Sequence, residues 1–175
     1  MVSRKSTTKK IAVLSLLTGL SLIMFIIENL LPPLFIPGAK LGLANIFSFA
    51  ALIIYSPVEA FIVLIARTFL GAIFAGNLSA LLYSFTGGVV AMAVSSVLVY
   101  TVYPKISVMA VSITSAMFHN ITQNLVFVFL SGTTLMFGYM PYLALIGIFS
   151  GAVVGGIILA VFKGIPVKTF EKITT

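Results

Sequence analysis

The sequence contains no cysteine and no tryptophan, and its three acidic residues are all glutamates, so aspartate is missing as well. Without cysteine, the chain forms no disulfide and has no thiolate nucleophile or cysteine-held metal centre. Charged residues make up only 7% of the 175 residues, whereas soluble globular domains carry roughly 25%. Water is therefore not the main solvent of this chain.

Apolar residues dominate instead. They make up 61% of the chain and form continuous runs close to the roughly 20 residues that a helix needs to cross a bilayer core. A transmembrane β-barrel would show alternation over strands of about 10 residues. We therefore predict an all-α integral membrane protein, a single transmembrane domain over residues 1–175 built as a bundle of about six helices. The expected spans are residues 11–31, 41–56, 58–76, 78–102, 107–131 and 139–162.

The first apolar run follows a basic segment, as it does in a signal peptide. The run from Ile11 to Leu31 is longer than the core of a typical signal peptide, and no small-x-small cleavage site closes it. We therefore expect an uncleaved first helix.

The net charge of +7 comes mainly from two basic tails, at about residues 1–10 and 163–175. Cytoplasmic segments of membrane proteins carry an excess of lysine and arginine. The expected topology puts both tails and Lys105 on one side and only Lys40 on the other. We therefore expect a multi-pass protein of the cell membrane with both termini in the cytoplasm. The basic residues form no stripe interleaved with aromatics, so we expect contact with the lipid bilayer and no nucleic-acid partner.

Several catalytic motifs are missing. The sequence has no GxxxxGK[ST] phosphate loop, so we expect no ATP hydrolysis by this chain itself. It has no serine–histidine–acid arrangement in an elbow context and no clustered carboxylates to hold a magnesium diphosphate. His119 is the only histidine, which is too few for a common transition-metal site. We expect no enzyme activity, no catalytic residue, no metal and no cofactor.

Arg67 lies near the middle of the third expected span, where a charge costs about 2.5–3.5 kcal/mol on insertion scales. Such a residue needs either a partner carboxylate or an anionic ligand. Glu28 is the only acid expected to face the outer half of the bundle. Two compatible interpretations stay open: a buried Arg67–Glu28 ion pair, and an arginine that contacts a ligand.

The fifth expected span carries the densest polar cluster. Its polar residues repeat at helical spacing and share one stripe: Ser112, Ser115, His119, Thr122 and Gln123, widened by Asn120 and Asn124. At membrane depth such groups must be satisfied inside the protein or line a cavity. Hydrogen bonds between helices account for several of them, and seven on one helix favour a cavity or binding face.

Small residues four apart recur on two spans. They are Gly147, Gly151 and Gly155 on the last span, with Ser15 and Gly19 on the first. This spacing forms a groove that lets another helix approach closely in lipid. Packing within the bundle and docking of a partner membrane protein are the two interpretations.

Ser56, Pro57 and Glu59 have the form of a capping box at the start of the third span, with serine at N-cap, proline at N1 and glutamate at N3. In that motif the two side chains satisfy free backbone N–H groups of the first turn. We expect a structural role for Glu59.

Several blocks of the sequence resemble one membrane-protein family. The blocks are Glu28-Asn29 with Pro32, the run PGAKLGLAN from Pro37 to Asn45, Arg67-Thr68-Phe69-Leu70-Gly71, Ser84-Phe85-Thr86-Gly87-Gly88, and His119-Asn120 with Gln123. The family is called heptaprenyl diphosphate synthase component I, or the Gx transporter family. The resemblance covers nearly the whole chain, and the run that ends at Asn45 is its most specific part.

Members of this family are similar in size and layout to the substrate-binding S components of energy-coupling factor (ECF) transporters. The resemblance implies a ligand cavity that opens outward beneath the first external loop. It also implies a transmembrane coupling subunit and cytoplasmic ATPases as partners. S components often pack through alanines four apart on the first helix, where this chain offers Ser15 and Gly19. The residues expected to meet a ligand are Glu28, Asn29, Lys40, Asn45, Arg67, His119, Asn120 and Gln123.

Arg67 and Lys40 favour an anionic group on that ligand. The family name implies a second function, that of a noncatalytic membrane partner of a soluble prenyl diphosphate synthase. That function includes menaquinone metabolism or an accessory role in membrane electron transfer. The expected ligand is accordingly small and anionic, or related to isoprenoids and quinones.

Overall fold

The computed structural model describes residues 4–30, 42–76 and 78–163, and every regular element in them is a helix. The elements are α1 Arg4–Leu30, α2 Asn45–Ile54, α3 Pro57–Ala75, α4 Leu78–Thr101, α5 Val108–Ser131, the 3₁₀ helix η1 Thr134–Tyr139 and α6 Met140–Phe162. Each of the six expected spans overlaps one α-helix. The 3₁₀ helix η1 precedes α6, in a segment for which we expected no helix.

Four stretches of the described residues are long and apolar enough to cross a membrane. They are Thr7–Glu28, Pro57–Ala75, Leu81–Thr101 and Thr134–Phe162, the last of which joins η1 to α6. Helix α5 has 24 residues, or about 36 Å of helix, so it is long enough but more polar than the other four. The chain is an all-α membrane protein, as predicted.

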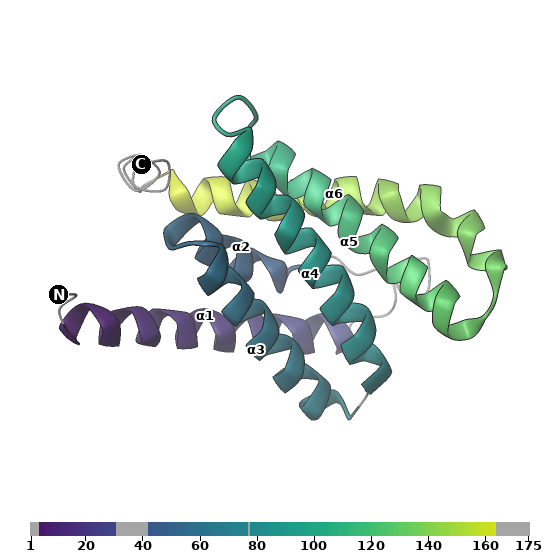
Figure 1. The fold of residues 1–175 in the computed structure, drawn as a ribbon, viewed down its shortest axis with the longest axis horizontal. Coiled ribbons are helices and arrows are strands. Elements are labelled where there is room, and N and C mark those ends of the chain that lie inside the picture. The colour runs from purple at the N-terminus through teal and green to yellow at the C-terminus, as the bar shows by residue number, and fades with distance from the viewer. Residues whose placement is uncertain (1–3, 31–41, 77, 164–175) are drawn as a thin grey trace.

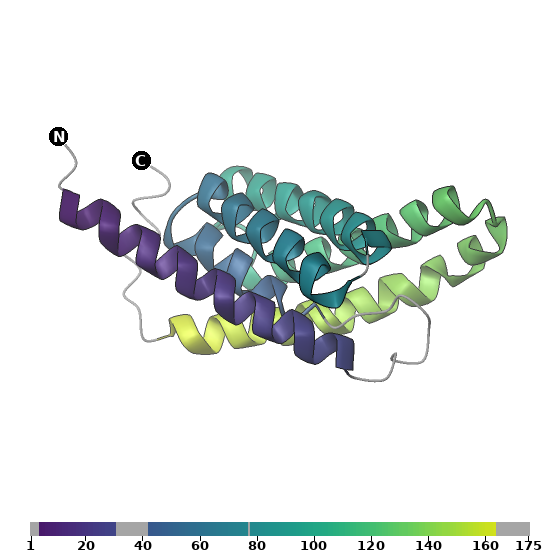
Figure 2. The same ribbon diagram turned by 90° about the horizontal axis from the view of Figure 1, so that it is seen from below.

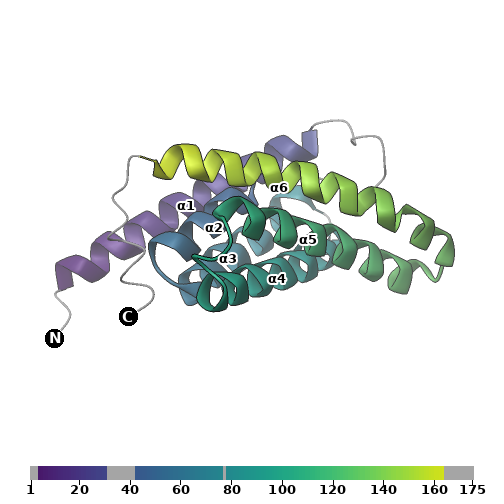
Figure 3. The same cartoon turned by 90° about the horizontal axis from the view of Figure 1, so that it is seen from above.

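The two ends of the described chain lie toward the same side of the molecule (Figure 1). The first turn of α1 and the last turn of α6 are at the same end of the molecule, together with the loop between α4 and α5 (Figure 1). Lys10 lies in the second turn of α1, Lys105 in the loop and Lys163 directly after α6. Helix α1 runs diagonally across one face in Figure 2, and α5 and α6 form a hairpin that extends beyond the other helices (Figures 2 and 3).

Helix α2 is shorter than the span expected at residues 41–56. It has ten residues, which rise about 15 Å, whereas a bilayer core is about 30 Å thick. The helix starts late because Gly42, at φ +69°, and a turn precede Asn45, and Pro57 begins α3 soon after α2 ends. Seven of its residues are buried, so α2 lies inside the bundle, in contact with α1, α3, α4 and α6.

Three glycines of α6 set the distance between α5 and α6. A Cβ atom at Gly147 would lie 2.7 Å from Met117 Cα, and one at Gly151 would lie 2.5 Å from Ile113 Cα. At Gly155 the nearest atom would be Met109 Cα at 3.0 Å. The groove predicted on α6 is therefore filled by the backbone of α5.

Glycines also bring α3 and α4 close to their neighbours. A Cβ atom at Gly71 of α3 would lie 2.7 Å from the ring of Phe25 on α1. On α4, a Cβ atom at Gly88 would lie 2.7 Å from Leu64 Cδ1. These contacts join α1, α3 and α4 in that order and leave α2 enclosed behind them.

Candidate functional site

A polar cavity lies between α2, α4, α5 and α6. Its lining contains polar side chains from all four helices: Asn45, Ser95, Ser112, Ser115, His119, Asn120 and Ser150. Apolar side chains, among them Phe49, Met92 and Val154, complete the wall. Because lipid offers no hydrogen bonds, polar groups gathered from four helices make this cavity the place where the bundle can hold a polar ligand.

The cavity has a volume of about 40 Å³. One water molecule needs roughly 10–15 Å³ measured in this way, so the space holds a few waters. Sites for drug-sized molecules commonly measure about 300–1,000 Å³. A ligand larger than a few atoms therefore fits only if the surrounding helices move apart.

Hydrogen bonds between helices account for part of the polar stripe on α5. Four of its side chains bond to a neighbouring element: Ser112 Oγ to Gly151 O (2.8 Å), Ser115 Oγ to Ser95 Oγ (2.6 Å), Asn120 Nδ2 to Leu143 O (3.1 Å) and Asn124 Nδ2 to Met136 O (2.9 Å). Three of the four also line the cavity. The polar stripe therefore both bonds α5 to its neighbours and lines the cavity.

Gly87 places α4 against the centre of this stripe. A Cβ atom there would lie 2.8 Å from Gln123 Cγ and 3.1 Å from the backbone oxygen of His119. A side chain at this position would push α4 and α5 apart. Gly87 therefore fixes the wall of the cavity beside His119.

Gly42 and Asn45, at the start of α2, line one end of the cavity. Gly42 has a left-handed backbone, which glycine adopts without strain, and its C=O accepts a hydrogen bond from Asn45 N (2.8 Å). A Cβ atom at Gly42 would lie 3.1 Å from Asn45 Nδ2. Asn45 Oδ1 accepts a 2.5 Å hydrogen bond from an Nη atom of Arg67. Arg67 is thus connected to the cavity through Asn45.

Helix α1 holds the same turn from the other side. Glu28 accepts hydrogen bonds from the backbone N–H of Leu43 (2.9 Å) and, over a longer distance, from that of Ala44 (3.5 Å). Ser21, two turns earlier on α1, donates to Ala44 O (2.7 Å). A carboxylate at a helix N-terminus stabilises the partial positive charge there, so Glu28 caps α2 from a different helix.

The ion pair that we considered between Arg67 and Glu28 does not form. Glu28 lies close enough to act electrostatically on Arg67, but within residues 4–30, 42–76 and 78–163 the ion pair is that of Lys10 with Glu59. The carboxylate of Glu28 is directed at the backbone of α2 and the guanidinium of Arg67 at Asn45. The two charges belong to one cluster without touching.

The comparisons with known proteins give one match. The family model for heptaprenyl diphosphate synthase component I matches residues 17–161. The chain belongs to this family. A search of curated proteins and a search of solved structures found no match. The region matched to the heptaprenyl diphosphate synthase component I family includes the start of α2 and every residue that lines the cavity.

The structure gathers some of the predicted ligand residues and separates others. Asn45, His119 and Asn120 line the cavity, while Arg67 and Glu28 lie around the start of α2. Gln123 is buried against Gly87 and is not part of the lining. Lys40 and the side chain of Asn29 lie outside the described residues. A small cavity lies at the His119 and Asn120 part of the stripe, and Arg67 is connected to it through Asn45 without lining it.

Two of the polar lining residues were missed by the sequence analysis. Ser95 of α4 and Ser150 of α6 are single serines in apolar helices, both nearly inaccessible to solvent. Serine is common in transmembrane helices as a packing residue, so neither position gave a signal.

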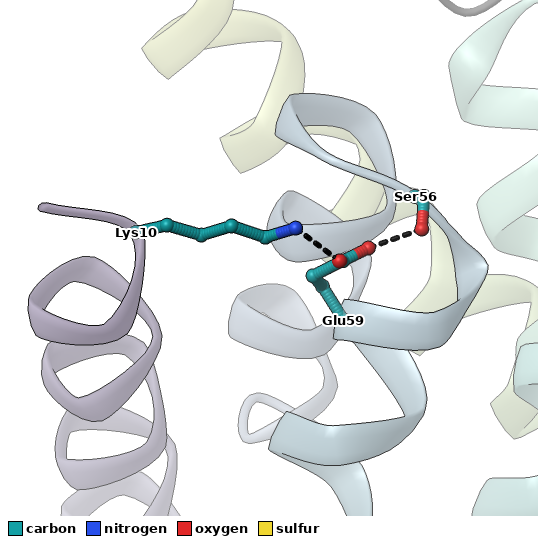
Figure 4. Close-up of polar contacts among 3 residues, drawn as sticks. All are labelled: Lys10, Ser56 and Glu59. Carbon is teal, nitrogen blue, oxygen red and sulfur yellow. Dashed lines mark hydrogen bonds and ion pairs between the residues drawn. The ribbon is translucent and has the colours of Figure 1, made fainter. Parts of the chain in front are cut away.

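A second polar cluster joins α1 to α3 at the opposite end of these helices. The Lys10 ammonium forms an ion pair with Glu59, which also accepts a hydrogen bond from Ser56 Oγ (Figure 4). Lys10 Nζ lies 5.6 Å from the centre of the Tyr55 ring. The capping box predicted here is therefore incomplete: the Ser56 side chain makes no bond to the helix backbone, because it donates to Glu59 instead. Lys10 precedes the region matched to the family, whereas Ser56 and Glu59 lie within it. None of the three residues lines the cavity.

Ser15 and Gly19 lie on the outer surface of α1, where both are exposed. A Cβ atom at Gly19 would meet no atom within 4 Å. These two residues are therefore not used for packing within the described chain, in contrast to the glycines of α6.

Proposed function

We propose that this chain is a membrane-embedded, ligand-binding subunit of the S-component type, acting in an ECF-type transporter. The observation that carries the proposal is the polar cavity between α2, α4, α5 and α6, because such a lining is unfavourable at membrane depth unless it has a function. The chain has no phosphate loop, so ATP hydrolysis would belong to separate ATPases reached through a coupling subunit. The ligand would be small and polar, with an anionic group near Arg67.

The distribution of charge supports a single orientation in the cell membrane. The segments that hold Lys10, Lys105 and Lys163 lie at one end of the molecule (Figure 1), and cytoplasmic ends carry such an excess. In this orientation both termini are cytoplasmic and the start of α2 faces the outer half of the bilayer. The ligand would then enter from outside, past the turn held by Glu28.

Lipid-facing Ser15 and Gly19 of α1 support the assignment of a partner. Small residues four apart permit close approach of another helix, and nothing in the described chain occupies this strip. We assign the strip to the coupling subunit. Substituting leucine for Gly19 would leave the bundle folded and weaken that association.

Mass spectrometry of small molecules that co-purify with the protein tests the binding function. We choose Ala91→Leu as the informative variant, because Ala91 lines the cavity and its longer side chain fills the space. Ala93→Leu is the matched control, since Ala93 lies on the same helix and is exposed to lipid. A bound compound should be lost from the Ala91 variant and kept by the Ala93 variant. Equal retention in both would exclude this cavity as the binding site.

The family name supports a second candidate, a noncatalytic membrane partner in prenyl diphosphate or menaquinone metabolism. The two candidates predict different partners. Adjacent genes for a coupling subunit and ATPases favour the transporter, whereas genes for a soluble prenyl synthase or flavoprotein favour the second candidate. Co-purification of either set with the tagged chain would decide between them.

A further inference from the structure

The start of α2 carries positive charge from two sources. The aligned peptide dipoles of a helix are equivalent to roughly half a positive charge at its N-terminus, where Leu43 N and Ala44 N donate to Glu28. The guanidinium of Arg67 lies nearby, on Asn45. Ala44 and Ile46 at this helix start are buried and Asn45 is half-buried, so the charge is only partly exposed. Short helices that begin within a membrane commonly direct their N-termini at anionic groups of a ligand.

Arg67 is only partly satisfied in this arrangement. Its residue is 3% exposed, and a guanidinium has five N–H donors. One Nη donates to Asn45, while Nε is buried and meets no acceptor among the described residues. Within the described residues, this buried arginine has a donor without an acceptor and no carboxylate in contact, an arrangement that suits an anion.

The Glu28 carboxylate offsets the positive charge at the start of α2, but it does not contact the guanidinium of Arg67. It makes one hydrogen bond of normal length, to Leu43 N, and one of 3.5 Å, to Ala44 N. The carboxylate also lies in the last turn of α1, where the dipole of its own helix disfavours negative charge. An oxyanion placed between the start of α2 and Arg67 would satisfy both at once, which Glu28 does not.

We infer that the first turn of α2 and Arg67 form a binding site for an oxyanion, and that the carboxylate of Glu28 occupies this site in the absence of ligand. The ligand of the cavity then carries a carboxylate or phosphate group that replaces Glu28. This inference rests on the proposed function, because Gly42 and Asn45 belong both to this turn and to the cavity lining. It narrows the anionic group of that ligand to an oxyanion at the start of α2, and it adds a competing group within the protein.

Chemical rescue of Glu28→Ala tests the inference without knowledge of the ligand. The purified full-length chain is unfolded thermally in detergent, with sodium acetate, inorganic phosphate or sodium chloride at equal ionic strength. Removing Glu28 leaves the site empty, so acetate or phosphate should raise the melting temperature in a saturable way. At saturation we expect a gain of about 5 °C or more over chloride. The more effective anion identifies the ligand group as a carboxylate or as a phosphate.

Two further variants make the rescue specific. Glu59→Ala removes a carboxylate from the start of α3, and no anion should restore its stability, because Glu59 faces partly exposed Lys10 instead of a buried arginine. The double variant Glu28→Ala, Arg67→Gln should lose the gain seen with Glu28→Ala alone. If Glu28→Ala aggregates in chloride, the same comparison is made on its recovery as a monodisperse protein from each buffer.

The inference is contradicted if neither anion exceeds chloride, or if Glu59→Ala is rescued as well as Glu28→Ala. It is also contradicted if the gain persists without Arg67. These outcomes leave the binding function standing, because the Ala91→Leu comparison tests the cavity separately. Loss of the cavity function alongside a successful rescue would instead show an anion site with a different ligand.

Discussion

Across the contact between α5 and α6, three glycines remove side chains from one helix so that the two backbones meet. Around the start of α2, polar side chains join the helices instead. Hydrogen bonds of Ser21, Glu28, Asn45 and Arg67 connect α1, α2 and α3. The first interface combines backbone van der Waals contact with hydrogen bonds that are satisfied within the protein, from Ser112 to Gly151 O and from Asn120 to Leu143 O. The second contains polar groups that the protein satisfies incompletely, since Arg67 Nε meets no acceptor in the described part of the chain. The comparison separates the supporting framework from the region where a ligand would act.

The largest effect is expected at the glycine contact. Gly151→Leu places a side chain where even a Cβ atom would lie 2.5 Å from Ile113 Cα. Overpacking of a tight site costs about 1–3 kcal/mol and occasionally more, and leucine at a backbone contact should exceed the upper value. Gly156→Leu is the control on the same helix, because nothing lies within 4 Å of a Cβ atom there. Thermal unfolding in detergent should show a large loss for the first variant and little change for the second. Equal losses would mean that the glycine groove does not hold α6 to α5.

A smaller effect is expected from the bond between Arg67 and Asn45. Hydrogen bonds to charged groups contribute about 1.5–3 kcal/mol, so Arg67→Ala and Asn45→Ala should each destabilise the bundle. Because both variants remove the same bond, the double variant should lose less than the sum of the two. Free energies of unfolding for the four proteins of this cycle give the coupling directly. Additive losses, within about 0.5 kcal/mol, would show that the two side chains act independently.

The smallest effect is expected at the ion pair between Lys10 and Glu59. The side chain of Lys10 is 43% exposed, and exposed ion pairs contribute about 0–1 kcal/mol. Lys10→Met should therefore lower the free energy of unfolding only slightly, and the difference should shrink as salt is added. Unfolding at low and high ionic strength measures it. A loss as large as that of Arg67→Ala would mean that α1 is held mainly at this end, and would remove the contrast between the two polar clusters.

The framework was largely predictable from the sequence because it depends on local patterns. Apolar runs bounded by proline and glycine placed all six helices, and the four-residue spacing of Gly147, Gly151 and Gly155 predicted a close helix contact. The length of α2 was not predicted, since the apolar run continues through the residues that form its first turn. The left-handed backbone of Gly42, which delays the helix, does not show in hydropathy.

The site was predicted in part. His119 and Asn120 were found because seven polar residues on one helix are unusual in lipid. The partners of Arg67 and Glu28 were not, because a pairing of opposite charges is the simplest expectation from composition. The actual acceptor for Glu28 is a backbone turn, and backbone donors cannot be recognised from residue types. A single serine such as Ser95 can be assigned to the cavity only once the helix packed against it is known.

Accessibility of the cavity to water is the central claim, and the absence of cysteine from the sequence makes it directly measurable. Ser115→Cys introduces one thiol into the cavity wall, and Ala93→Cys introduces one on the lipid-facing side of α4. A small, charged, membrane-impermeant thiol reagent is added to intact cells, and the labelled fraction of each variant is measured over time. The proposed cavity, reached from outside when the surrounding helices move apart, predicts that Ser115→Cys is labelled and that Ala93→Cys is not. Equal resistance of both thiols, or labelling of Ser115→Cys only after the cytoplasmic side is exposed, would contradict it.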